Sequence, residues 1–159
     1  MLAAAAVGAR CVAFEPCPEV FEWVLQNIAL NGVADRVEAH QEAAGCSCRV
    51  VAFTSGQDTV NHVVRLGQER EVLTRSVSMT TLDSALGKRC PILLKIDVEG
   101  YETEALNGAS ALLQSSGLCV LIMELAGSGS LYGFDERVLH ARMQELGFEA
   151  CIYEPSSVA

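Results

Sequence analysis

Acidic side chains follow directly after several short apolar runs of this sequence. The segments V-A-F-Glu15, I-Asp97-V-Glu99 and L-I-M-Glu124 have this form, and so does I-Y-Glu154 near the C-terminal end. If the runs are parallel strands, their carboxyl ends meet at one edge of an open α/β sheet, where ligands bind. Gathering like charges there is unfavourable unless cations or hydrogen-bond donors offset it. We therefore expect these acids to line a ligand site, the simpler alternative being that strands end at polar residues.

Glu15 has a more specific interpretation. An acid that ends the second strand of a nucleotide-binding half can accept hydrogen bonds from both hydroxyls of a ribose. Dehydrogenases that use NAD and methyltransferases that use S-adenosylmethionine share this arrangement. A glycine-rich turn after the first strand usually distinguishes them, and no G-x-G pattern precedes Glu15. Both classes therefore stay open on this residue alone.

Other residue types that could do chemistry give weaker signals. Lys95 precedes Asp97 by two positions and shares a strand face with it, which fits either a site residue or a buried structural ion pair. The histidines are scattered without ligand spacing and are more typical of solvated or packed side chains; they are His40, His62 and His140. Cys46-Ser-Cys48 has no second pair and no nearby histidine, so we expect no metal site.

Composition excludes several classes of protein. The chain has 159 residues, 50% of them hydrophobic and 19% charged, which predicts one domain over residues 1–159 with a substantial core. Its formal net charge of −9 repels phosphate backbones, so we expect no nucleic acid partner. The longest apolar run, Leu118–Met123, is far shorter than the roughly 20 residues of a membrane span. No feature of the sequence indicates an oligomeric state.

The seven cysteines bear on the compartment. Their number is odd, and several lie inside apolar, strand-like runs. This pattern favours reduced, mostly buried thiols in an intracellular protein, and we expect a cytoplasmic one.

Hydrophobic periodicity divides the chain into alternating helices and strands. Helices are predicted at 2–7, from Phe21 to Asn31-Gly32, from Ala105 to Leu113, and from the Asp135 cap to Gly147. Strands are predicted at 11–14, 36–40, 49–53, 75–80, 91–97, 118–124 and 148–153, with a polar loop containing Gly56 and Gly67. The alternation implies right-handed crossovers and a mostly parallel sheet with helices on both faces.

Several blocks of the sequence resemble the FkbM-type S-adenosylmethionine-dependent methyltransferases. The similar stretches are V-A-F-E-P-C-P-E-V-F (12–21), N-I-A-L-N-G (27–32), V-S-M-T-T-L-D (77–83), L-K-I-D-V-E-G-Y-E (94–102) and L-N-G-A (106–109). The resemblance extends over most of the chain. It implies a Rossmann-like class I methyltransferase fold, with S-adenosylmethionine as the methyl donor and a small-molecule, sugar or lipid-like hydroxyl as the acceptor.

The resemblance also implies roles for individual residues. Glu15 corresponds to the ribose-binding acid, and Glu42 falls where residues near the adenine lie. Asp97 and Glu99 correspond to acids that face the methyl-transfer site, and Glu124 closes the next strand beside them. Asp97 is our first choice for the carboxylate that orients the hydroxyl or takes its proton, and Glu99 is the second.

The sequence departs from the family at its beginning. Family members start with a strand and a D-x-G-A-N-x-G-type loop, whereas Met1 falls within the helix that should follow that loop. We therefore expect a domain whose first strand is missing. This departure supports one alternative, a non-catalytic remnant or interaction domain of the same fold. Glu15 and the alternating layout leave a nicotinamide-dependent oxidoreductase as a weaker alternative.

Overall fold

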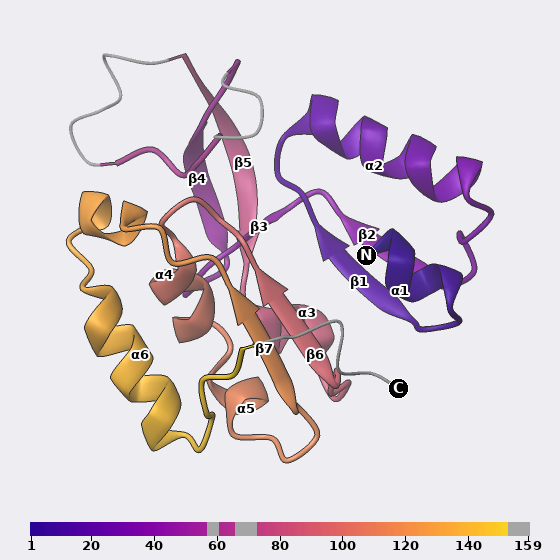
Figure 1. The fold of residues 1–159 in the computed structure, drawn as a ribbon. Coiled ribbons are helices and arrows are strands. Elements are labelled where there is room, and N and C mark those ends of the chain that lie inside the picture. Colours follow the sequence, from indigo (N-terminus) through magenta and orange to yellow (C-terminus); the bar gives the residue numbers. More distant parts are fainter. Residues whose placement is uncertain (57–60, 66–72, 153–159) are drawn as a thin grey trace.

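The computed structural model describes residues 1–56, 61–65 and 73–152, whose strands form three small sheets (Figure 1). Strand β1 (Cys11–Phe14) pairs in parallel with β2 (Val37–His40), and β6 (Leu93–Ile96) pairs in parallel with β7 (Val120–Met123). The third sheet has the order β3-β5-β4. The α/β class with parallel strands is thereby confirmed. Within the described residues β1 and β6 are not hydrogen-bonded to each other, so they do not form one continuous sheet.

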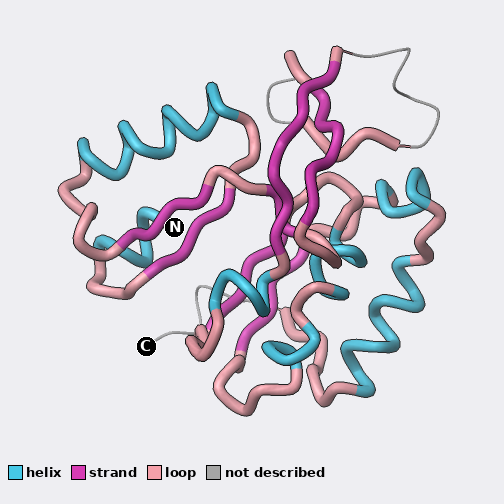
Figure 2. The backbone as a smooth tube through the Cα atoms, turned by 180° about the vertical axis from the view of Figure 1, so that it is seen from behind, coloured by secondary structure: helices cyan, strands magenta, loops and turns pink. Residues whose placement is uncertain are grey.

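Two helices pack against one face of the β1–β2 pair. Helices α1 (Leu2–Ala6) and α2 (Pro18–Leu30) lie beside it, on the side of the molecule opposite α4 to α6 (Figures 1 and 2). Their contact with the strands is an apolar cluster of Ala5, Ile28 and Val33, with Leu2, Cys11, Val24, Val37 and Ala39 packed against it. The side chains of Val12 and Phe14 pack instead against the largest core cluster. The alternation of side chains along β1 therefore joins two parts of the core.

The largest core cluster lies between the β6–β7 pair and four helices. These are α3 (Leu82–Leu86), α4 (Glu102–Asn107), α5 (Ser110–Leu113) and α6 (Glu136–Glu145). One face of the pair contributes Leu94, Ile96, Leu121 and Met123 to this cluster. On the other face Leu93, Val120 and Ile122 are 50%, 42% and 44% exposed. In the part of the chain that the structure describes, helices thus cover only one face of β6–β7.

The third sheet forms one side of the cavity described below. Strand β5 (Thr74–Thr80) pairs in parallel with β3 (Ala43–Ala44) and antiparallel with β4 (Arg49–Thr54). The predicted strands 49–53 and 75–80 are confirmed, whereas β3 was not predicted. Phe53 forms a further antiparallel bridge with Val63. Part of the predicted polar loop, including Gly67, lies outside the described residues.

The predicted helix from Ala105 to Leu113 is interrupted, because α4 and α5 are separate elements. A Cβ atom at Gly108 would lie 2.0 Å from the Gly45 carbonyl oxygen, so the backbones approach too closely there for any other residue. The Asp83 carboxylate then accepts hydrogen bonds from the backbone N–H groups of Ala111 and Leu112, at 2.9 and 3.0 Å. A cap supplied by a distant residue thus starts a new helix where periodicity predicts a continuous one.

The structure differs from the sequence-based predictions in three further features. Residues 148–152 form no strand, and the rest of the predicted strand lies outside the described residues. Helix α3, whose Thr81 cap accepts a hydrogen bond from Ser84 N at 3.0 Å, was not predicted. The thiols are not mostly buried. Only Cys17 is buried, and five are exposed because they lie in loops or at element ends: Cys46, Cys48, Cys90, Cys119 and Cys151.

Candidate functional site

The loop after β6 places two of the predicted acids. Asp97 directly follows the last residue of β6, and its carboxylate oxygen lies 2.6 Å from Lys95 Nζ. The two side chains form an ion pair, as their shared strand face suggested, but they are 39% and 58% exposed rather than buried. An exposed ion pair contributes little to stability. Lys95 therefore offsets part of the negative charge at this edge.

A buried carboxylate holds the rest of that loop. Glu102 is only 3% exposed, and its Oε1 accepts hydrogen bonds from the backbone N–H groups of Val98 and Gly100, at 3.2 and 3.1 Å. Between these residues lies Glu99, which has a φ of 54°. In the described part of the chain it is the only non-glycine residue with a positive φ. This left-handed conformation is unfavourable for a residue with a Cβ and persists when surrounding contacts impose it. The two hydrogen bonds to Glu102 supply such contacts, a role that the sequence analysis missed.

The turn requires glycine at position 100. Gly100 has a φ of 94°, and a Cβ atom there would lie 2.6 Å from the Ser128 carbonyl oxygen. Any side chain would therefore meet both backbone strain and a steric clash. The following residue, Tyr101, is buried and packs edge-to-face on Tyr132 at 5.2 Å. The block D-V-E-G-Y-E thus has a structural reason at each of its last three positions.

Glu15 directly follows β1, as predicted. Its side chain is half-buried, and Oε1 accepts a hydrogen bond from Cys17 N at 2.8 Å. Burial raises the pKa of this carboxyl, and the hydrogen bond from Cys17 opposes the shift. In the described part of the chain its other oxygen has no hydrogen-bond partner. One oxygen is therefore fixed and the other is available to a ligand.

Glu42 lies in the turn between β2 and β3, near His40. The His40 Nδ1 atom is 3.6 Å from a Glu42 oxygen, and its Nε2 atom is 2.7 Å from Glu38. The ring of His40 also stacks on Phe14, with centroids 5.0 Å apart. His40 is thus a packed, paired histidine, as the sequence analysis favoured.

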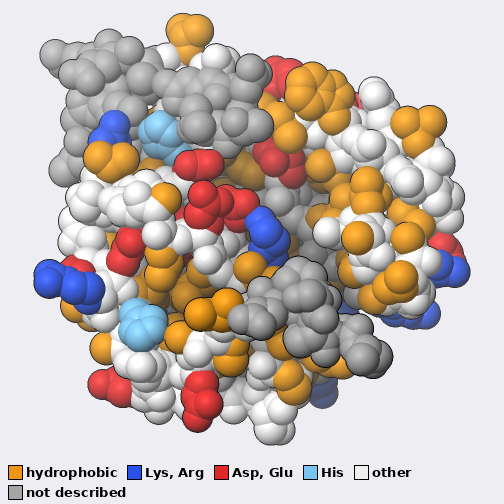
Figure 3. Space-filling model, viewed as in Figure 1, with side chains coloured by type: hydrophobic (Ala, Val, Ile, Leu, Met, Phe, Trp, Pro, Cys, Tyr) orange, Lys and Arg blue, Asp and Glu red, His pale blue; other side chains and the backbone are white. Residues whose placement is uncertain are grey.

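A single cavity brings all five predicted site residues together. Its volume is about 470 Å³, within the range of sites for small molecules. Figure 3 shows acidic side chains gathered at a hollow in this face of the molecule. The predicted residues among its lining are Glu15, Glu42, Asp97, Glu99 and Glu124. The cavity lies at the carboxyl ends of β1, β6 and β7, the edge predicted from the spacing of the acids.

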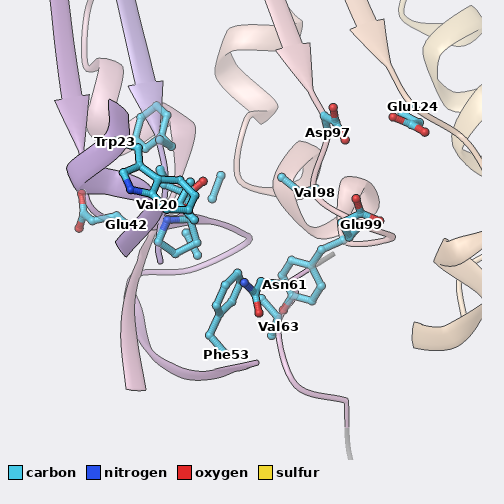
Figure 4. A pocket seen from close by; sticks show the side chains of 16 residues that line it. Val20, Trp23, Glu42, Phe53, Asn61, Val63, Asp97, Val98, Glu99 and Glu124 are labelled. Carbon is cyan, nitrogen blue, oxygen red and sulfur yellow. The ribbon is translucent and has the colours of Figure 1, made fainter. Parts of the chain in front are cut away.

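The apolar lining of the cavity was missed by the sequence analysis. Phe53 and Val63 come from β4 and its bridge partner, and Tyr101 comes from the loop after β6. Trp23, on the outer side of α2, is 58% exposed and lies on the same side as Glu42 (Figure 4). A signal for it was present, because it is the one tryptophan of the chain and lies at a helix position that the core does not cover.

Figure 4 shows two sides of this cavity. Trp23, Val20 and Glu42 lie on one side, and Asp97, Glu99 and Glu124 lie on the other. Burial raises the pKa of Glu99, and the negative charges of Asp97, Glu124 and Glu102 raise it further. A carboxyl with a raised pKa is a better proton acceptor than an ordinary one. The arrangement can therefore hold a polar ligand at one side and accept a proton at the other.

Two further observations concern metal ions and membranes. Within residues 1–56, 61–65 and 73–152, no three His, Cys, Asp or Glu side chains are grouped so as to hold a metal ion. None of the described helices combines the length and apolar character needed to cross a bilayer.

Comparisons with known proteins agree with this fold. A family model described as "Methyltransferase FkbM domain" matches residues 2–150. A solved structure, the methyltransferase FkbM from Methylobacillus flagellatus KT, is similar with a TM-score of 0.57 and 18% sequence identity. The match covers 86% of this chain and 30% of that one, so the chain spans less than a third of that protein's length. At this identity the likeness concerns the fold. Comparison with curated proteins gave no significant match.

Proposed function

The chain belongs to the FkbM methyltransferase family, and on this premise we propose that its cavity binds S-adenosylmethionine for O-methylation of a small-molecule, sugar or lipid-like hydroxyl. The observation that carries the proposal is the meeting of Glu15, Asp97 and Glu124 at one cavity, each directly after a parallel strand. Ligands of open α/β sheets bind at this edge.

The residues on the Glu15 side fit the nucleoside part of this molecule. The free oxygen of Glu15 can accept hydrogen bonds from ribose hydroxyls, while Cys17 N holds the other oxygen in place. Trp23 offers an exposed aromatic face for an adenine ring, and Glu42 lies beside it. A cavity lined by carboxylates also suits a molecule with a positive sulfonium and a free ammonium group.

The residues on the opposite side fit the reaction itself. When bound, S-adenosylmethionine supplies an electrophilic methyl group. As the new O–C bond forms and the S–C bond to the methyl group breaks, which leaves the thioether S-adenosylhomocysteine, the acceptor hydroxyl must be oriented and must lose its proton. We assign the proton to Glu99, since burial and its acidic neighbours raise its pKa. Asp97, whose charge is partly offset by Lys95, orients the hydroxyl together with Glu124.

This assignment reverses the order of the two acids inferred from the sequence. Asp97 ends the strand and was the first choice as proton acceptor. However, its carboxylate already forms an ion pair with Lys95 at 2.6 Å, so the lysine competes with an acceptor hydroxyl for that carboxylate. The more enclosed Glu99 has no such lysine partner among the described residues.

Ligand binding distinguishes this proposal from the nicotinamide alternative. Equilibrium dialysis of the chain with labelled S-adenosylhomocysteine, the demethylated product, should show saturable binding, with NADH unable to displace it. Saturable NADH binding without binding of S-adenosylhomocysteine would instead indicate the oxidoreductase.

A further inference from the structure

The charge distribution in the cavity bears on the chemical class of the acceptor, an inference that rests on the proposed function. Asp97, Glu99 and Glu124 lie on the side of the cavity away from Trp23 (Figure 4). Burial raises the pKa of Glu99, and the nearby negative charges of Asp97 and Glu124 raise it as well. Their negative potentials therefore add up at the place where we locate the acceptor hydroxyl.

Few cations offset this potential. Lys95 pairs with Asp97, and it is not part of the cavity lining. The charge of His62 acts on Glu99 in the opposite direction, but more weakly than the three neighbouring carboxylates. Among the described lining residues there is no lysine, arginine or histidine, the side chains that bind phosphate and carboxylate groups.

Apart from the acids and Asn61, the cavity lining consists of apolar and aromatic side chains. Phe53 and Val63 lie between the two groups of acids (Figure 4), Tyr101 also lines the cavity, and all three side chains are buried. The hydroxyl of Tyr132 donates to the Val63 carbonyl oxygen at 2.7 Å, which fixes the segment that carries Val63. An acceptor here would place an apolar surface against these side chains and its hydroxyl towards the carboxylates.

We propose that the acceptor has an apolar body and is uncharged or carries an amine, and that Glu99 and Glu124 exclude acceptors with a phosphate or carboxylate near the reacting hydroxyl. An anionic acceptor would bring a further negative charge beside the half-buried Glu99 and its two more exposed acidic neighbours, which is unfavourable. An ammonium group in the same place would form a favourable interaction with them.

Three phenols of similar size, each with its side chain next to the hydroxyl, test this preference: 2-(2-aminoethyl)phenol, 2-ethylphenol and 3-(2-hydroxyphenyl)propanoate. Ligand-observed NMR titrations with the chain, in the presence of S-adenosylhomocysteine, should show the propanoate binding at least roughly tenfold more weakly than the other two. In Glu99→Gln/Glu124→Gln the difference should shrink to about threefold or less. The matched control Glu145→Gln/Glu149→Gln removes two exposed carboxylates outside the cavity and should leave it unchanged.

Four results would each overturn the proposal. The three phenols could bind equally, the propanoate could bind more tightly than the others, or no phenol could bind. The fourth is a preference that stays unchanged in the cavity variant. If the double variant melts early, Glu124→Gln replaces it, because that side chain is exposed. Titration with S-adenosylhomocysteine alone distinguishes failure of the acceptor class from failure of the proposed function. Binding of this molecule without discrimination among the phenols overturns only the acceptor class. No binding of it overturns the proposed function, and the acceptor class with it.

Discussion

The buried Glu102 carboxylate accepts a hydrogen bond from the backbone N–H of Gly100, 3.1 Å away, and a second one from Val98. Through this contact a residue that lies outside the cavity lining fixes the loop that carries Asp97 and Glu99. The conformation of the site thus depends on a side chain with no direct access to a ligand.

Removal of this carboxylate should destabilise the protein. We expect Glu102→Ala to lower the free energy of unfolding by roughly 1–3 kcal/mol, because two enclosed N–H groups lose their acceptor. Glu102→Gln keeps an acceptor oxygen and should lose less. Denaturant unfolding measures both, with the exposed Glu145→Ala as control. Equal stability of Glu102→Ala and the control would show that the loop does not depend on this residue.

The close approach at Gly100 gives a second prediction. Gly100→Ala combines a φ of 94° with a Cβ atom 2.6 Å from the Ser128 carbonyl oxygen. Gly147→Ala has a similar φ of 92° but open space around the Cβ position, so it isolates the backbone strain. We expect Gly100→Ala to be more destabilising than Gly147→Ala by about 1–3 kcal/mol in the same unfolding experiment. Equal losses would argue against the close contact.

The cap that Asp83 of α3 provides at the start of α5 gives a third prediction. Asp83→Ala leaves the N–H groups of Ala111 and Leu112 without their acceptor and should lower the free energy of unfolding by about 0.5–2 kcal/mol. Asp83→Asn should recover part of this loss. Amide hydrogen exchange at Leu112 checks the mechanism, since exchange there should accelerate in Asp83→Ala. Unchanged protection would contradict it.

The raised pKa of Glu99 makes stability depend on pH. A folded-state pKa above the ordinary value of 4.5 means that the native state binds the proton more tightly than the unfolded state. The free energy of unfolding therefore falls as pH rises above that value, until the folded-state carboxyl has ionised.

Glu99→Gln cannot ionise and should escape this loss. We expect its melting temperature to match that of the unsubstituted chain near pH ~3.5 and to exceed it near pH ~7. Calorimetry across this range measures the difference, with Glu145→Gln as the control for removal of a carboxylate. A difference of the same size at both ends of the range would exclude the assigned pKa direction.

Local sequence patterns predicted much of the fold and the edge of the site. The apolar run before Glu15 and the one before Asp97 both form parallel strands, because each is short, continuous and ended by a polar residue. Because these two strands end at the same edge of the fold, Glu15 and Asp97 come together and both line the cavity.

Features that depend on contacts distant in sequence were not predictable. The break at Gly108 results from a close approach to Gly45, and the cap on the next helix comes from Asp83. Neither leaves a periodic signal in its own segment. Likewise, Phe53 reaches the cavity through its pairing in the β3-β5-β4 sheet, and the buried role of Glu102 depends on how the loop before it folds.

Fluorescence of Trp23 provides the most direct test of the central claim, that the cavity binds the nucleoside of S-adenosylmethionine with Glu15 on the ribose. Trp23 is the one tryptophan of the chain and lies in the cavity lining, so bound adenine should quench its emission. We predict saturable quenching by S-adenosylhomocysteine, weakened about 10- to 100-fold in Glu15→Gln and unchanged in Glu145→Gln. No saturable quenching, or equal affinity in Glu15→Gln, would contradict the claim.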